Sequence, residues 1–231
     1  MSEILMVITG ADRLTMADGT EHPTGYWAEE FLAPYRAFTG AGYQVSVATP
    51  GGVVPTVDPA SLRPEVNGGS EGAAAVAVAL DAAAELRRPL DLAGVDPSRY
   101  AAVFYVGGHG PMQDLAQNAD SARLLRTTLD TGRPLALVCH GVAALLATEE
   151  EDGAWPFAGY RLTGFSAAEE QQTGLSDRLP WLLQNRVVAL GADYSAAEPW
   201  APYVVVDRGL HTGQNPASSA SLAEALLKTI G

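Results

Sequence analysis

The sequence predicts a single α/β domain, over residues 1–231, built around a mainly parallel sheet. Short runs of apolar and β-branched residues alternate with helix-length segments along most of the chain, which is typical of βαβ units. Hydrophobic residues make up 47% of the chain and charged residues 18%, as in a globular protein. No linker, repeat or low-complexity tract divides the chain, so we expect one domain.

The N-terminal half shows the alternation most clearly. Strands are expected where apolar residues run together, at 3–9, 43–50, 100–108 and 133–139. Helices are expected over the longer segments between them, at 26–42, 71–87 and 121–132. The run AAAVAVAL at 73–80 is far shorter than the roughly 20 residues that a membrane span needs. We therefore expect it to be part of a buried helix.

After residue 139 the pattern is less regular. A helix is expected to begin directly after the fourth strand, with no spacer between them. The remaining segments are expected to form a short strand pair or a strand with a turn at 153–165, a helix and then a strand within 177–190, two strands around a turn at 203–213, and a helix that starts at Pro216.

The charge of the chain excludes some classes of partner. The net charge is −13, and such a field repels both nucleic acid and anionic membranes. The segment MSEILMVITG lacks a basic leader, so we expect a first strand there and not a signal peptide. The single cysteine excludes an internal disulfide and fits a reducing compartment, and a cytoplasmic location is therefore expected.

The most informative stretch is LALVCHGVAALL, at 135–146. A direct passage from strand to helix at Cys139 predicts a sharp turn that displays the side chain, as in a nucleophile elbow. The start of a helix also stabilises a thiolate, so we expect the pKa of Cys139 to be lowered. The segment YVGGHG, at 105–110, ends the neighbouring strand at the same edge of the sheet, where ligands bind in open parallel sheets.

Several residues near this edge are candidates to assist Cys139. His140 supplies an acid or base, although adjacent residues do not easily form a linear triad, so a third group must orient the ring. Glu169 and Glu170 are both candidates for that group. The backbone N–H groups of Gly108 and His140 are expected to form an oxyanion hole. His109 is a residue type that binds zinc, but the chain has one cysteine and no spaced histidine pair, so no metal is expected.

Six segments resemble the ThiJ/PfpI superfamily, and within it the branch of small heat-shock chaperones and glutathione-independent glyoxalases (glyoxalase III). In family order they are TGYWAEEFLAPYRAFTGAGYQVSVATPGG, VDPASL, VFYVGGHGPMQDL, LALVCHGVAALL, LTGFSAAEE and HTGQNPASS, and they are distributed over essentially the whole chain. The resemblance implies a flavodoxin-like three-layer sandwich, related to class I glutamine amidotransferases, and a homodimer. It implies no cofactor.

The resemblance also implies roles for individual residues. Cys139 is the nucleophile and His140 its partner, while Glu30, favoured over Glu29, lies beside the sulfur and shuttles a proton. Glu170 falls where the branch places the acid that orients the histidine, with Glu169 as the alternative. Gly108 matches the oxyanion donor, and we expect His109 and Trp27 to lie near the substrate.

The leading hypothesis is a cofactor-independent enzyme that converts a small reactive carbonyl, such as methylglyoxal, and water into a 2-hydroxy acid. One alternative is a hydratase or tailoring enzyme for a larger metabolite, with aromatic residues such as Trp27 and Trp200 lining a wider pocket. Another is a non-enzymatic holding chaperone or oxidation sensor, for which a reactive Cys139 would be the sensing group.

Overall fold

Buried apolar strands form the centre of the protein, as the alternation predicts. The computed structural model describes residues 2–231, and its main sheet has seven strands in the order β10-β11-β7-β6-β1-β4-β5. Every neighbouring pair is parallel except β10 and β11, which form a hairpin. The strands are β1 (Glu3–Val7), β4 (Gln44–Thr49), β5 (Leu90–Asp91), β6 (Ala102–Tyr105), β7 (Leu135–Val138), β10 (Val204–Asp207) and β11 (Leu210–Gly213).

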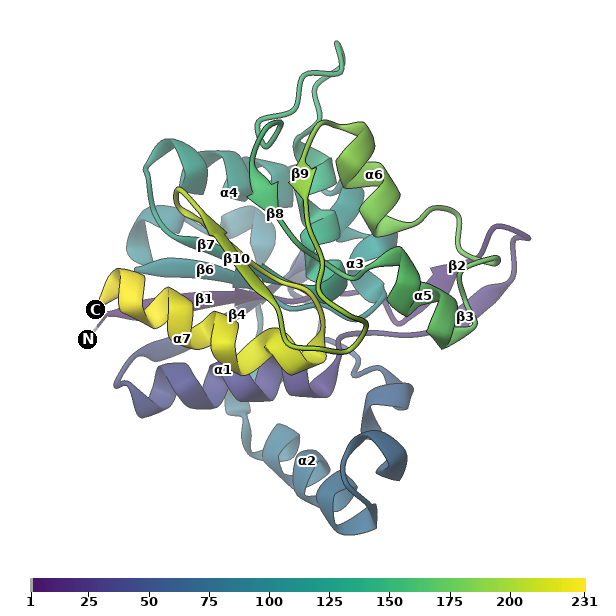
Figure 1. Ribbon diagram of the computed structural model, residues 1–231. Helices are drawn as coiled ribbons and strands as arrows, with labels where there is room; N and C mark the ends of the chain where they lie inside the picture. Colours follow the sequence, from purple (N-terminus) through teal and green to yellow (C-terminus); the bar gives the residue numbers. More distant parts are fainter. Residues whose placement is uncertain (1) are drawn as a thin grey trace.

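Helices cover both faces of this sheet and complete the three-layer sandwich that the resemblance implies (Figure 1). One face is covered by α1 (Ala28–Gly40) and α7 (Ser219–Ile230), which pack against each other. The other is covered by α3 (Gly110–Gln113), α4 (Ala119–Asp130) and the 3₁₀ helix Cys139–Thr148. The helix expected after the fourth strand is therefore present, but it has the tighter 3₁₀ winding.

Smaller elements lie around the main sheet, and one of them, β8 (Arg161–Leu162), packs beside β10. A hairpin of β2 (Arg13–Thr15) and β3 (Glu21–Pro23) has no counterpart in the expected elements. Of the two alternatives expected for 153–165, the strand with a turn is present: a turn precedes β8, which pairs with β9 (Asp193–Tyr194), a strand that follows α6 (Leu183–Ala189) in the chain. The short helix α5 (Ala167–Thr173) precedes α6, and it positions two of the candidate acids.

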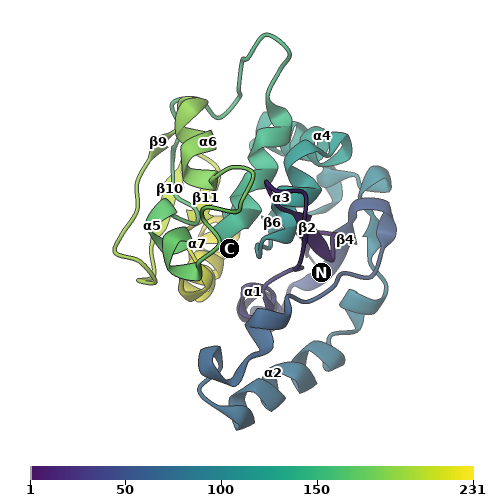
Figure 2. The same ribbon diagram turned by 90° about the vertical axis from the view of Figure 1, so that its right-hand side faces the viewer.

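The expectation of a buried helix at 73–80 is wrong. The helix α2 (Ser70–Ala82) forms, but none of its residues is buried, and it projects away from the sheet in both views (Figure 2). Alanine has little side chain to bury, so an alanine-rich helix gains little from docking on a core. Only a few residues, including Val76 and Leu80, pack partly against the rest of the protein. Within residues 2–231, no helix has the length and apolarity to cross a membrane.

Candidate active site

The predicted elbow is present at the end of β7. Cys139 has φ 55°, in the left-handed region that residues other than glycine rarely adopt. Such strain persists only where the surrounding structure enforces it, and it concentrates at functional sites. The side chain of Cys139 is 4% exposed, so only a small part of it is accessible.

Glycines around the elbow let backbone segments approach closely. A Cβ atom on Gly107 would lie 2.4 Å from Oε2 of Glu30 and 2.6 Å from the carbonyl oxygen of Val138. On Gly141 it would lie 2.9 Å from the carbonyl oxygen of Tyr105. Such distances are shorter than van der Waals contact, so only glycine fits. The ends of β6 and β7, the elbow and α1 thereby meet at one point.

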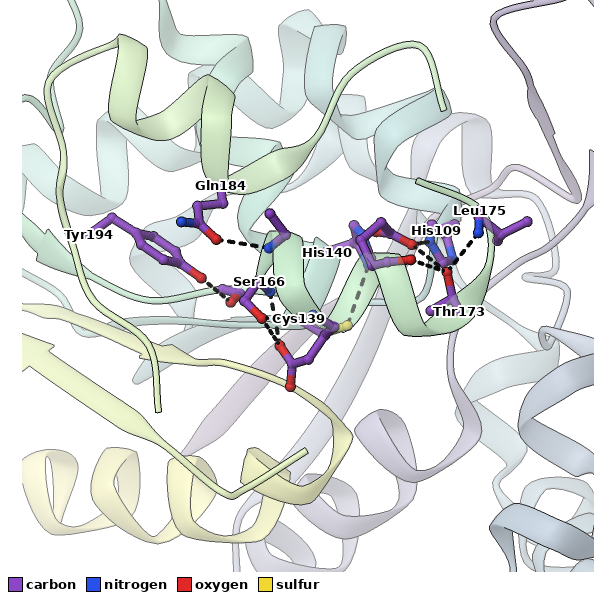
Figure 3. A network of polar contacts seen from close by, with 12 residues as sticks. His109, Cys139, His140, Ser166, Thr173, Leu175, Gln184 and Tyr194 are labelled. Carbon is purple, nitrogen blue, oxygen red and sulfur yellow. Dashed lines mark hydrogen bonds and ion pairs between the residues drawn. The ribbon is translucent and has the colours of Figure 1, made fainter. Parts of the chain in front are cut away.

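A linear triad forms even though its first two members are adjacent in the chain (Figure 3). The sulfur of Cys139 lies 3.5 Å from Nδ1 of His140, and Nε2 of the same ring lies 2.7 Å from Oε2 of Glu170. The strained backbone of Cys139 turns the two side chains toward each other. The hydrogen bond to Glu170 places the ring proton on Nε2, which leaves Nδ1 free to accept a proton from the thiol.

The choice between Glu169 and Glu170 is settled by the start of α5. Ser166 caps this helix, and its backbone N–H and hydroxyl both donate to Glu169 in a capping box. Glu169 also accepts hydrogen bonds from the side chain of Asn215 and from the backbone N–H of Trp200. Glu169 therefore holds the surrounding loops together, and Glu170 orients the histidine.

His109 occupies a place that the sequence did not indicate. Its Nε2 lies 2.9 Å from Oε1 of Glu170, and its ring centroid lies 4.2 Å from that of His140. The hydroxyl of Thr173 donates to the same oxygen of Glu170, 3.0 Å away. His109 is therefore a second hydrogen-bond partner of Glu170, the acid that contacts His140. The ring of Phe165 lies 4.6 Å from that of His140. Neither Phe165 nor Thr173 was identified from the sequence as a neighbour of the site.

The fold also creates a histidine pair that the sequence spacing did not reveal. His109, His140 and Glu170 each offer a ligand atom, and these atoms lie within 4.8 Å of one another. Two imidazoles and a carboxylate are ligands that suit zinc and other transition metals. Here the same three groups bind one another through hydrogen bonds. The expectation that no metal is needed stays a prediction.

Glu30, at the first turn of α1, is fully buried beside the sulfur of Cys139. Neither of its carboxyl oxygens has a well-formed hydrogen bond within residues 2–231. Burial raises the pKa of Glu30 to about 8, an effect that the nearby Cys139 thiol and Gly107 backbone only partly offset. The carboxyl group is therefore mostly protonated at neutral pH. Glu29, the other candidate, is exposed.

The expectation of a lowered pKa for the thiol is wrong. Burial raises the pKa of Cys139, and the neighbouring Glu30 carboxylate raises it further by charge repulsion. The backbone N–H groups of His140 and Gly108 lower it, as expected of an oxyanion hole, but by less. Repulsion from Glu30 disappears when Glu30 carries a proton. The two side chains thus form one coupled acid pair, in which a proton on the carboxyl favours the thiolate.

The histidine and its orienting acid have opposite shifts. Burial lowers the pKa of His140, and His109 lowers it further, against the opposing effect of Glu170. For Glu170, burial alone would raise the pKa, but the charge of His140 and hydrogen bonds from His109 and His140 hold it well below its usual range. An ionised Glu170 beside a neutral His140 is the arrangement that a general base requires.

Trp27, the remaining predicted site residue, lies just before α1 and lines a groove next to the site. Its backbone N–H donates to the carbonyl oxygen of Gly107, 3.0 Å away. Gly108 has φ 96°, and a Cβ atom there would lie 2.7 Å from the nitrogen of Trp27. The backbone of Trp27 therefore packs directly against the oxyanion loop.

Comparison with known proteins gives a consistent result. The model of the DJ-1/PfpI family matches residues 23–229. The protein/nucleic acid deglycase HchA of Pseudomonas aeruginosa is 31% identical over 99% of this chain and 80% of that protein. The glyoxalase III structure from Candida albicans superposes with a TM-score of 0.80, at 25% identity, over 98% of this chain and 96% of that one.

A human relative, glutamine amidotransferase-like class 1 domain-containing protein 1, is 38% identical over 143 residues. That match covers 62% of this chain and 65% of the human protein. The chain thus matches slightly less than two thirds of this relative's length.

The raised pKa of Glu30 predicts how stability depends on pH. An unfolded chain loses this proton near pH 4.5, whereas the folded protein keeps it up to about pH 8. The free energy of unfolding should therefore fall as pH rises across this window, by on the order of a few kcal/mol, and this contribution should level off above it. In Glu30→Gln this contribution should be absent. Urea unfolding of both proteins at pH 5 and pH 8 measures the difference, and identical pH slopes would contradict the assignment.

Proposed function

Because this chain belongs to the DJ-1/PfpI family, we propose that it is a cofactor-independent enzyme acting on small reactive carbonyls, with glyoxalase III-like chemistry. The observation that carries the proposal is the triad of Cys139, His140 and Glu170 beside a protonated, buried Glu30. The names of two relatives, a deglycase and a glyoxalase III, support chemistry at a carbonyl carbon. The model substrate is a 2-oxoaldehyde such as methylglyoxal, and the product a 2-hydroxy acid.

In the first step the thiol of Cys139 gives its proton to Nδ1 of His140, and the sulfur adds to the aldehyde carbon. This forms a C–S bond and converts the carbonyl oxygen into an oxyanion. The backbone N–H groups of Gly108 and His140, which already interact with the sulfur, are placed to bind that oxygen. Proton transfer from Glu30 to the oxygen gives a neutral hemithioacetal and leaves a carboxylate on Glu30.

In the second step the Glu30 carboxylate removes the hydrogen on the former aldehyde carbon, which gives an enediolate. Glu30 then returns this proton to the adjacent carbon, while His140 moves the hydroxyl proton from the first oxygen to the second. The result is a thioester of the 2-hydroxy acid on Cys139. A pKa near 8 suits a group that must donate and accept a proton at neutral pH.

In the last step water hydrolyses the thioester. The Glu30 carboxylate takes a proton from the attacking water, and the tetrahedral intermediate expels the sulfur of Cys139 as His140 donates to it the proton taken up in the first step. The thiol is reprotonated and the 2-hydroxy acid leaves. The overall reaction adds one water molecule to one 2-oxoaldehyde. It involves no net oxidation or reduction and uses no cofactor.

Cys139→Ala should abolish methylglyoxal turnover, because no other nucleophile occupies the elbow. The wild-type protein should also gain the mass of the aldehyde on Cys139 during turnover, and the variant should not. Lactate formation and intact-protein mass spectrometry measure the two effects. Full activity of Cys139→Ala would end the proposal.

Glu170→Gln should lower kcat by roughly 10²- to 10⁴-fold, because His140 loses the charge that stabilises its protonated form and fixes its ring. Gln171→Ala is the matched control, since Gln171 is exposed on the same helix. Steady-state kinetics on both variants gives the comparison. A kcat for Glu170→Gln equal to that of the control would remove Glu170 from the mechanism.

A holding chaperone is the second candidate, favoured by the exposure of α2. This helix has no buried residue, and Val66 and Val78 are more than half exposed. From the resemblance we also propose a homodimer, which would cover part of such a surface, and from the single cysteine a cytoplasmic location. If the protein is a chaperone, the wild-type protein and Cys139→Ala should suppress aggregation of an unfolded client equally well. The Val78→Asp variant should suppress it less. Aldehyde turnover without such suppression would reject this candidate.

A further inference from the structure

A groove of about 580 Å³ lies between α2 and the N-terminal ends of α1 and α7, and the proposed chemistry does not use it. Its walls include two tryptophans, Trp27 and Trp200, together with Val66, Val76 and Pro216. Glu29 is the only charged side chain among the described residues that line it. The volume falls in the range of roughly 300–1,000 Å³ that is typical of pockets for drug-sized ligands. Methylglyoxal, which has only a few non-hydrogen atoms, would leave most of the groove unfilled.

The groove is adjacent to the catalytic groups on two sides. On one side, Trp27 donates its backbone N–H to Gly107, and Glu29 directly precedes the buried Glu30. On the other side, the ring of Trp200 lies 5.6 Å from that of Phe165, which in turn lies 4.6 Å from the ring of His140. A substrate whose carbonyl reaches Cys139 would therefore extend its other end toward the two tryptophans.

Trp200 is held in this place at a cost in backbone strain. Its φ is 66°, and within residues 2–231 only Cys139 and Arg208 share such a conformation among residues other than glycine. Its backbone N–H donates to Glu169, 2.9 Å away, and its indole N–H donates to Gln172, 2.6 Å away. The side chain nevertheless remains 44% exposed. Backbone strain thus holds a large aromatic ring at the wall of the groove, and both N–H groups of Trp200 already have acceptors. Such a surface suits an apolar ligand.

We propose that Trp200 and Trp27 form an aromatic clamp that selects 2-oxoaldehydes carrying a neutral aromatic substituent. This inference rests on the proposed function and names its substrate class. The substituent stacks against the indole rings, in the offset or edge-on geometries that aromatic pairs prefer, while the aldehyde carbon meets the sulfur of Cys139. Glu29 disfavours substituents that carry a negative charge.

Phenylglyoxal and methylglyoxal, assayed side by side, test the clamp. The wild-type protein should have the higher kcat/KM for phenylglyoxal. Trp200→Ala should lower that value about tenfold, since an aromatic contact of this kind is worth roughly one power of ten. It should change kcat/KM for methylglyoxal less than twofold. Trp200→Phe should keep most of the preference, and Trp181→Ala, in a different pocket, should keep all of it.

The outcomes separate the clamp from the chemistry. Equal losses for both substrates in Trp200→Ala, or no preference in the wild-type protein, would overturn the clamp while leaving the glyoxalase-like reaction in place. Failure of the wild-type protein to convert either aldehyde would overturn the proposed function, and the clamp with it.

A charged analogue tests the role of Glu29. We expect 4-carboxyphenylglyoxal to be converted several-fold less efficiently than phenylglyoxal, and Glu29→Gln to narrow this gap. The readout is the ratio of the two kcat/KM values within each protein, because Glu29 lines the groove in which the substituent is proposed to bind. Equal kcat/KM values for the two aromatic aldehydes in the wild-type protein would overturn the proposed selection against negative charge.

Discussion

The burial of Glu30 against the sulfur of Cys139 is the constraint on which the rest of the site depends. A buried carboxylate without well-formed hydrogen bonds costs several kcal/mol, and the side chain avoids this cost by keeping its proton. Burial raises the pKa of both groups, and a negative charge on Glu30 raises the pKa of Cys139 further. A proton on Glu30 removes the charge repulsion and therefore favours the thiolate. The helix start alone would suggest an independently acidic thiol, which the geometry does not support.

Much of the surrounding structure serves to hold this pair in place. Gly107 gives Glu30 room to approach the end of β7, and the left-handed backbone of Cys139 turns the sulfur toward His140. Glu169 joins α5 to the loops that carry Trp200 and Asn215, so that its neighbour Glu170 reaches His140 from a fixed direction. Packing and hydrogen bonds in these loops thus determine the geometry of the reacting groups.

The sequence predicted those parts of the molecule that depend on local patterns. Apolar runs located the central strands, and the direct passage from strand to helix located the elbow at Cys139. The resemblance pointed to Glu30 and Glu170, and their burial and hydrogen bonds agree with the places it gave them. What failed depended on contacts between distant segments. Burial raises the pKa of Cys139, and so does Glu30, more than 100 residues away, while the pairing of His109 with Glu170 has no signal in the spacing of the chain. The helix α2 looked buried because its composition is apolar, but alanine side chains provide little area to hold it against the core.

The most direct test of this account is the protonation state of Glu30, measured by infrared difference spectroscopy. A carbonyl stretch from a protonated carboxylic acid should be present at pH 6, should titrate with an apparent pKa near 8, and should be missing in Glu30→Gln. Thiolate absorbance, followed in the same titration, should show that ionisation of Cys139 depends on Glu30. A spectrum in which Glu30 is already ionised at pH 6 would contradict the central claim that the two groups share one buried acid site.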